Sequence, residues 1–103
     1  MPKFVLAYHG KPDISGPEEG ADHMERWMAW SKGLGDAVVD PGLPVGKSMT
    51  VTPTEVLDHG GENPISGVTI LQAAGFDRVI EMAKSCPHLS GTGTIEIAEA
   101  MDM

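Results

Sequence analysis

The sequence is poor in cysteine and in positive charge. Its 103 residues include one cysteine, Cys86, so no disulfide bond can form within the chain. Seven Lys and Arg residues stand against 15 Asp and Glu residues, which gives a formal net charge of −8. Nucleic acids and anionic membrane surfaces bind clusters of Lys and Arg, and no two basic residues are adjacent here. The composition therefore argues against a nucleic-acid partner and against a membrane partner.

Long apolar runs are also absent. Residues Met1 to Lys3 lead into a short apolar run that ends at Tyr8. This run is shorter than the core of a signal peptide and far shorter than a membrane span of roughly 20 residues. We therefore expect a cytoplasmic protein. The length of 103 residues leaves room for one hydrophobic core, which predicts a single domain over residues 1–103.

The run Lys3–Tyr8 predicts the first β-strand. Its apolar and β-branched residues follow one another without strict alternation, so both faces of the strand are expected to be covered. Helices of the same chain can cover one face. In so short a chain the second layer has to come from another copy, and a small core is often stabilised by oligomerisation. The sequence therefore predicts a homodimer.

An amphipathic helix is predicted over Pro17–Gly33. Ser15 or Gly16 can cap it, and Pro17 suits the first helical position. Two rows of side chains run along this helix. The first row is apolar and is expected to face the core: Met24, Trp27, Met28 and Leu34. The second row places a histidine beside two indoles: His23, Trp27, Trp30 and Leu34.

The remaining elements complete a mixed α/β pattern. Strands are predicted at residues 36–40, 47–52, 66–72 and 94–101, with a loop or loose hairpin at 53–64. A second helix is predicted to begin at Gly75 and to end at Cys86–Pro87. The order β–α–β–β–β–α–β, in which the third strand can belong to an insertion, fits a ferredoxin-like α+β sandwich. Two such antiparallel sheets, packed face to face, would form a dimeric α/β barrel.

A series of short motifs extends over nearly the whole chain. In order they are Phe4–Val5–Leu6–Ala7–Tyr8–His9–Gly10, Met24–x–x–Trp27–x–x–Trp30, Leu34–Gly35–x–x–Val38–Val39–Asp40–Pro41–Gly42, Gly67–x–x–Ile70 with Ala73, Cys86–Pro87–His88–Leu89, and Gly93–x–Ile95–Glu96–Ile97. Taken together, this series resembles the YCII-related (DGPF-type) family of small bacterial proteins. Glu62–Asn63–Pro64–Ile65 stands in place of the Asp-Gly-Pro-Phe signature, so the chain is more similar to the YCII branch.

The resemblance implies a fold and a set of functions. It implies the dimeric α/β barrel, with a cleft between the first helix and the sheet. It also implies, as in some members, acid–base catalysis by a His–Asp pair, in which His23 would be the histidine. A subset of the family is associated with alternative sigma factors, which implies a regulatory role as an alternative.

Three residues are candidates for acid–base chemistry. His23 is the strongest candidate for a general base, since the pKa of free histidine lies near neutrality. Asp40, at the end of the second predicted strand, could orient His23 or bind a substrate proton. His9 lies where the first strand opens into a loop, a position that often lines a cleft. In the competing interpretation His23 packs on Trp27, and His9 satisfies the loop backbone.

The aromatic residues are candidates for ligand binding. Trp27 and Trp30 can stack on a flat ligand, and Tyr8 is placed with them at the end of the first strand. Packing in the core or in a dimer interface is the alternative. Cys86 lies at a helix C-terminus, where the dipole raises a thiol pKa, so it is expected to be a buried filler. His88 is expected to fix the turn after this helix.

No metal ion and no other cofactor is predicted. The histidines are widely separated and no cysteine pair accompanies them: His9, His23, His59 and His88. Two hypotheses follow for the function. The chain is a small acid–base enzyme acting on an apolar, partly planar metabolite, or it is a non-enzymatic ligand-binding or interaction module. An accessible His23 with a shifted pKa, facing a cleft, would favour the enzyme. A buried His23 with both ring nitrogens engaged would favour the module.

Overall fold

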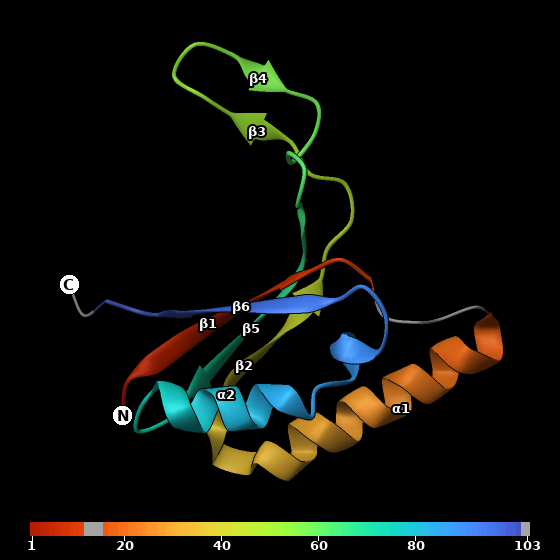
Figure 1. Cartoon of the computed structure of the whole chain (residues 1–103), viewed down its shortest axis with the longest axis vertical. Helices are drawn as coiled ribbons and strands as arrows, with labels where there is room; N and C mark the ends of the chain where they lie inside the picture. Colours follow the sequence, from red (N-terminus) through yellow and green to blue (C-terminus); the bar gives the residue numbers. More distant parts are fainter. Residues whose placement is uncertain (12–15, 102–103) are drawn as a thin grey trace.

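The computed structural model describes residues 1–11 and 16–101. Over these residues, two α-helices and a four-stranded antiparallel sheet form an α+β architecture (Figure 1). The elements are, in chain order, β1 (Lys3–His9), α1 (Pro17–Leu34), the 3₁₀ helix η1 (Gly35–Ala37), β2 (Val38–Pro44), β3 (Thr50–Val51), β4 (Val56–Leu57), β5 (Ile65–Gln72), α2 (Phe76–Lys84), the 3₁₀ helix η2 (Pro87–Ser90) and β6 (Thr94–Glu99). Ser15, one of the two predicted caps, lies outside the described residues, and Gly16 occupies the N-cap position of α1.

The sheet has the strand order β2-β5-β1-β6, and all neighbouring strands are antiparallel. β1 is central, with Leu6 opposite Thr69 of β5 and Ile97 of β6. This confirms the predicted α+β class and the antiparallel sheet. The sheet is open, because β2 and β6 form its two edges. One described chain therefore does not close into a barrel.

The hydrophobic core lies between the sheet and the helices. Alternate residues of β1, Phe4, Leu6 and Tyr8, are buried, because successive side chains of a strand point to opposite faces. They belong to one cluster with Leu71 of β5 and Val79 of α2. The core thus brings together the first strand, a strand over 60 residues later, and the second helix.

The opposite face of the sheet carries the other half of the β1 run. Val5 and Ala7 point to it, opposite Ile70 and Val68 of β5, and all four are half-buried. Both helices lie on the other side of the sheet (Figure 1). We call this surface, centred on these four residues, the open face. Both faces of β1 were expected to be covered. Within the described chain, only the face toward the helices is.

α1 turns a different row of side chains toward the core from the one expected. Met24 and Met28, predicted to face the core, are 56% and 64% exposed. The residues of α1 that pack against the core are Trp27, Trp30 and Leu34. The large indole rings fill the space between helix and sheet, with the Trp27 ring centroid 5.2 Å from that of Tyr8. This packing leaves the two methionines largely exposed to solvent.

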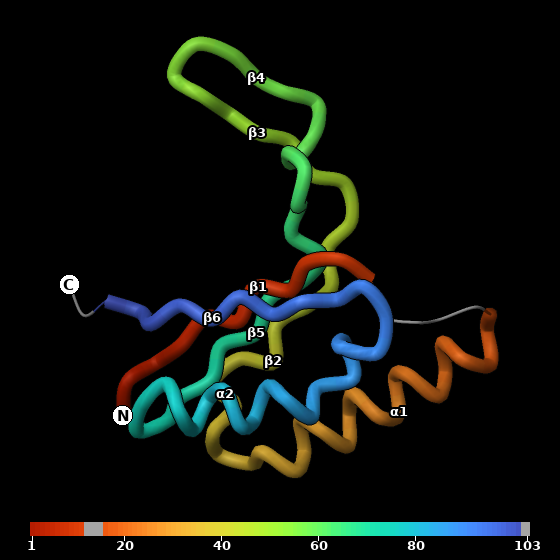
Figure 2. The backbone as a smooth tube through the Cα atoms, viewed as in Figure 1, coloured from red at the N-terminus to blue at the C-terminus, as the bar shows by residue number. Residues whose placement is uncertain are grey.

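The largest difference from the predicted elements lies between β2 and β5. The sequence predicts a strand over 47–52, but only Thr50–Val51 is paired, and its partner is Val56–Leu57 rather than the main sheet. Strand β2 ends at Pro44, and Gly46 follows two residues later, so the chain leaves the edge of the sheet after them. Residues 45–64 form a projecting hairpin, which we call the arm (Figure 2). The loose hairpin predicted for 53–64 is part of this arm.

Candidate functional site

A cavity of about 440 Å³ lies between α1 and one end of the sheet. Its lining comes from five elements and consists of Tyr8, His23, Met24, Trp27, residues 41–44, residues 66–68 and His88. Three of the residues predicted as a site, Tyr8, His23 and Trp27, are therefore brought together. The cavity lies beside the first helix, where the family resemblance implies a cleft.

Aromatic rings form one side of this cavity. The Tyr8 ring centroid lies 5.2 Å from that of Trp27 at an interplanar angle of 70°, and 5.1 Å from that of His88 at 57°. The His23 ring lies 5.9 Å from Trp27, at 43°. Edge-to-face and tilted contacts of this kind are favourable. They hold the rings in fixed orientations around an apolar space that suits a small ligand with a flat apolar part.

Two buried polar atoms at the cavity lack partners. In the part of the chain that the structure describes, neither His23 Nδ1 nor Ser66 Oγ has a hydrogen-bond partner. Buried polar atoms are nearly always hydrogen-bonded, because an unpaired one costs roughly 1–3 kcal/mol. Both residues line the same cavity. A molecule bound there can supply the two missing hydrogen bonds once the His23 and Ser66 side chains turn to expose these atoms.

The electrostatic surroundings favour a neutral His23 side chain. Burial lowers the pKa of His23 below its ordinary value of 6.5, and the charges of Arg26 and His88 lower it further. A neutral imidazole keeps one nitrogen free to accept a proton or a hydrogen bond. His23 is half-buried and lines the cavity, so its placement suits a general base.

A chain of hydrogen bonds joins the core to the cavity segment of β2. The buried Tyr8 hydroxyl donates to Thr69 Oγ1 at 2.8 Å, and the Thr69 hydroxyl donates to the Pro41 carbonyl at 3.0 Å. Burial raises the pKa of Tyr8 well above its usual 10, so the phenol stays protonated at neutral pH. Tyr8 therefore acts as a fixed donor that positions residues 41–44 rather than as an acid.

Replacing Tyr8 by phenylalanine is expected to lower the free energy of unfolding by about 1 kcal/mol, because the buried Thr69 hydroxyl loses the hydrogen bond from Tyr8 and keeps only the one to the Pro41 carbonyl. Thermal unfolding of Tyr8→Phe, Thr69→Val and the double variant measures this. Groups that share a hydrogen bond are coupled, so the double variant should lose less stability than the sum of the two single variants. Strictly additive losses would show that the two side chains act independently.

Asp40, the predicted acidic partner of His23, has a different local role. Its carboxylate accepts a hydrogen bond from the Gly42 N–H at 2.8 Å, which closes a short turn in β2. Asp40 is exposed and is not among the residues that line the cavity, although Pro41 and Gly42 are. The described structure thus leaves Asp40 outside the cavity lining and does not join it to His23.

Trp30 lies apart from the cavity as well. Its indole Nε1 donates to the Met82 carbonyl at 2.8 Å, which ties α1 to α2. Trp30 lines a second hollow together with Arg26 and Cys86. The structure therefore gives Trp30 a packing position, whereas Trp27, one turn earlier, faces both Tyr8 and His23.

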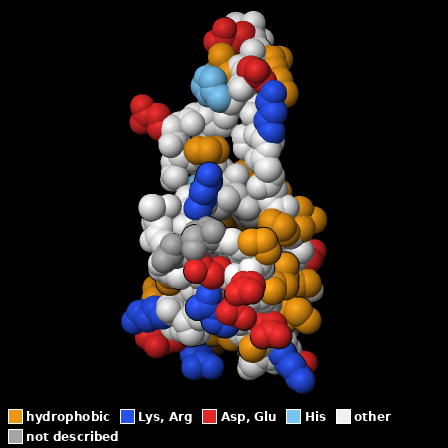
Figure 3. Space-filling model, turned by 90° about the vertical axis from the view of Figure 1, so that its right-hand side faces the viewer, with side chains coloured by type: hydrophobic (Ala, Val, Ile, Leu, Met, Phe, Trp, Pro, Cys, Tyr) orange, Lys and Arg blue, Asp and Glu red, His pale blue; other side chains and the backbone are white. Residues whose placement is uncertain are grey.

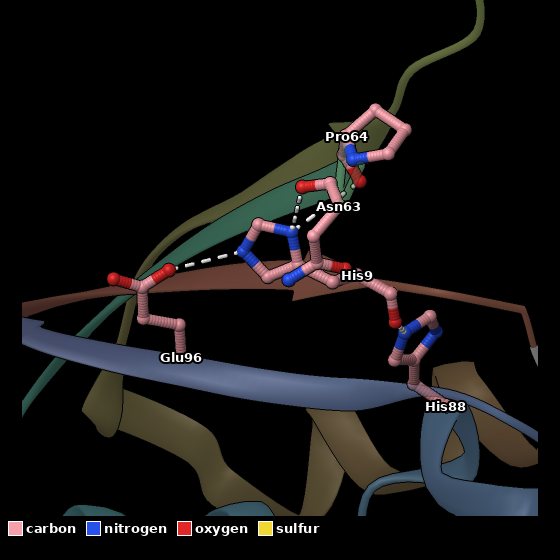
Figure 4. A network of polar contacts seen from close by, with 5 residues as sticks. All are labelled: His9, Asn63, Pro64, His88 and Glu96. Atoms are coloured by element: carbon pink, nitrogen blue, oxygen red, sulfur yellow. Dashed lines mark hydrogen bonds and ion pairs between the residues drawn. The ribbon is translucent and has the colours of Figure 1, made fainter. Parts of the chain in front are cut away.

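His9 lies at the same end of the sheet but points to the open face (Figure 4). Its Nδ1 lies 3.0 Å from the Asn63 carbonyl oxygen and 3.3 Å from that of Pro64. Its Nε2 lies 3.0 Å from Glu96 Oε1. Both ring nitrogens are therefore engaged. This geometry matches the structural interpretation of His9, which holds the base of the arm against β6.

His88 and Ser66 are cavity residues that were not predicted as part of the site. His88 is buried, and its Nε2 donates to the His9 carbonyl oxygen at 2.7 Å (Figure 4). It does fix the turn, as expected, but its ring also contacts Tyr8 in the cavity. Gly93 leaves room for it, since a Cβ there would lie 2.8 Å from His88 Nε2. A glycine five residues after a Pro–His pair is the one signal that the sequence offered.

Cys86, next to this turn, is buried. Burial raises the pKa of its thiol to about 11, so the thiol stays protonated at neutral pH and is a poor nucleophile. Over residues 1–11 and 16–101, no three His, Cys, Asp or Glu side chains are grouped to hold a metal ion. In the same ranges, neither α-helix has the length and apolarity of a membrane-spanning segment.

Comparison with known proteins adds no assignment: no protein-family model matches the chain, and no curated protein gives a significant match. The similarity to the YCII-related family therefore stays a prediction from the motifs.

Proposed function

We propose that this chain binds a small, partly planar metabolite in the cavity beside α1 and that His23 acts on it as a general base. The observation that carries the proposal is the pair of unpartnered buried atoms, His23 Nδ1 and Ser66 Oγ, at one apolar cavity. His23 is half-buried, faces this cavity and has a lowered pKa, which is the arrangement that favours the enzyme over the module. The motifs that resemble the YCII-related family support the same assignment.

The cavity lining suggests the class of ligand. No Lys or Arg is among the described residues that line it, so no fixed positive charge awaits an anion. The aromatic rings of Trp27 and Tyr8 line the cavity and favour contact with a flat apolar group. A hydroxyl or another polar group on the ligand could donate to His23 Nδ1, and a second could pair with Ser66 Oγ. We therefore expect an uncharged, partly aromatic or unsaturated compound with two polar groups.

A thermal-shift screen of small metabolites, run on the wild type and on His23→Ala, tests the site. A ligand at 100 times its dissociation constant stabilises the folded state by about 2.7 kcal/mol. For a domain of this size that raises the midpoint by roughly 10–20 °C. We expect His23→Ala to lose most of this shift and His59→Ala, in the arm, to keep it. A shift that survives in His23→Ala would place the ligand elsewhere.

The pH dependence of the reaction follows from the lowered pKa of His23. Protonation removes the free acceptor, so the reaction should slow as the pH falls through the pKa of folded His23, which lies below 6.5. Because the unfolded chain takes up this proton first, stability should also fall as the pH drops below 6.5. Rates measured between pH 4 and pH 8 should show the acid limb below 6.5. An acid limb above 6.5 would exclude His23 as the base.

A non-catalytic binding module is the alternative function. This alternative is favoured because other polar side chains already form hydrogen bonds within the chain. Tyr8 donates to Thr69, and Asp40 accepts from Gly42. Neither Tyr8 nor Asp40 is therefore free to act as a second acid–base group beside His23. A ligand that depends on His23 for binding but is not converted on prolonged incubation would establish the module, including a regulatory one.

We further propose that the chain forms a homodimer through the open face, with two sheets face to face as in a dimeric α/β barrel. Val5, Ala7, Val68 and Ile70 make the centre of this face apolar. Isolated apolar sheet faces favour packing against a second layer. Light scattering at micromolar concentration should report a dimer, and a stable monomer would exclude the barrel.

A further inference from the structure

The arm is an ordered hairpin. Thr50 pairs with Leu57 and Val51 with Val56, and the Thr52 N–H donates to the Glu55 carbonyl at 2.8 Å. Side chains add to the backbone pairing, because Thr50 Oγ1 donates to the His59 carbonyl at 2.8 Å. The ribbon forms a sheet of its own, separate from the main sheet. The arm therefore has a defined shape, with two legs and a turn.

One face of this ribbon is apolar and exposed. Val51 and Val56 are a cross-strand pair and are 77% and 61% exposed, and the nearby Met49 is 57% exposed. A two-stranded hairpin alone is marginally stable in water, so a projecting ribbon gains from packing against another surface. Hydrophobic side chains gather on one side of the molecule, at the arm and on the body below it (Figure 3). The arm thus carries a contact surface that its own chain leaves open.

The arm projects from the side of the sheet that carries the open face. His9, whose side chain lies on that side, holds the carbonyl groups of Asn63 and Pro64 at the base of the arm (Figure 4). The other leg is fixed by the Val45 N–H, which donates to the Ser66 carbonyl at 3.0 Å. The helices lie on the opposite side (Figure 1). The arm thus stands beside the open face, and the two surfaces form a corner that a second molecule could occupy.

The chain exposes more surface than a compact monomer of its mass. The accessible surface is 7117 Å², whereas a compact monomer of 10.9 kDa exposes about 5,600 Å². The radius of gyration is 14.8 Å, against about 13 Å for a compact domain of this length. The excess, on the order of 1,500 Å², is larger than the roughly 800 Å² that each partner buries in a standard interface.

We propose that the arm is a clasp for a second copy of this chain. The second copy packs on the open face, and each arm lays Met49, Val51 and Val56 along the side of its partner. Ten extended residues span roughly 33 Å, and packed layers lie about 10 Å apart, so the arm is long enough to pass the partner's sheet. This inference rests on the proposed homodimer but not on the proposed ligand site.

The dissociation constant of the dimer, measured by analytical ultracentrifugation, tests the clasp. Met49→Asp and Val51→Asp place charge on the contact surface without touching the core, and each should weaken the dimer at least tenfold. Met28→Asp is the matched control on α1, where the methionine is 64% exposed, and should leave the constant unchanged. Ala98→Asp, at the open face opposite Val5, should weaken the dimer as well. Circular dichroism of each variant establishes that it is folded.

The outcomes separate the two proposals. If Ala98→Asp dissociates the dimer while both arm variants bind as tightly as the wild type, the sheet-to-sheet dimer stands and the clasp is wrong. A wild type that is monomeric at all concentrations overturns both. Hydrogen exchange gives a second readout, made on a variant that circular dichroism has shown to be folded. The amide of Thr52 should exchange at least tenfold more slowly in the wild-type dimer than in folded, monomeric Ala98→Asp, and equal rates would contradict the clasp.

Discussion

Gly42→Ala is expected to lower the thermal midpoint by roughly 10–30 °C, which corresponds to a loss of about 2–5 kcal/mol. Gly42 has φ +72°, a conformation that costs other residues energy. A Cβ at this position would also overlap the carbonyl group of Val68 in β5. Since Gly42 and Val68 both line the cavity, the substitution should disturb ligand binding together with stability.

Gly46→Ala is the matched control for this prediction. Gly46 lies four residues later and has no positive φ, and a Cβ added to it would meet no atom within 4 Å. Its replacement by alanine should be neutral or slightly stabilising, because it restricts the unfolded chain. Differential scanning calorimetry of the two variants makes the comparison. Equal midpoints would mean that β2 does not pass β5 as closely as described.

Leu71→Ala is expected to destabilise the fold by about 2–5 kcal/mol. Leu71 is fully buried in β5, opposite Phe4 of β1 and Val38 of β2, so truncation leaves a cavity between three strands. The loss should appear as a fall in the denaturant midpoint with an unchanged slope, since the surface exposed on unfolding is nearly the same. Urea unfolding followed by tryptophan fluorescence measures it.

Leu43→Ala removes the same atoms from an exposed position of β2 and is the matched control for Leu71→Ala. Surface substitutions of this kind change stability by about 0.5 kcal/mol or less. A loss of equal size at both positions would contradict the division into a buried helix side and an exposed edge strand. Because Leu43 lines the cavity, its variant is also informative in the ligand screen.

The candidate site was predictable in part. His23 and Trp27 are four residues apart on one helix, and this spacing alone places their side chains together. Tyr8 was placed with them as the aromatic end of the first strand. His88 was not predicted as a cavity residue, because it comes from a turn 65 residues after His23 and reaches Tyr8 only through the sheet register.

The contacts of Asp40 and His9, the other two acid–base candidates, could not be predicted from the sequence either. Asp40 is near the cavity in sequence, but its carboxylate closes a turn on Gly42. His9 meets Glu96 because β1 and β6 are antiparallel neighbours, with Ala7 opposite Glu96 and His9 opposite Thr94. No spacing in the sequence specifies that pair. Contacts between strands depend on register, and register is fixed by the packing of the whole sheet.

The sequence by itself determined the α+β class, the order of the main elements and the indole-bearing row of α1. These follow from local periodicity, glycine and proline positions, and helix-end preferences, which act within a few residues. The tertiary structure alone decided which face of α1 is buried, where residues 45–64 project, and which side chains share the cavity. These depend on contacts between residues far apart in the chain, where packing outweighs local preference.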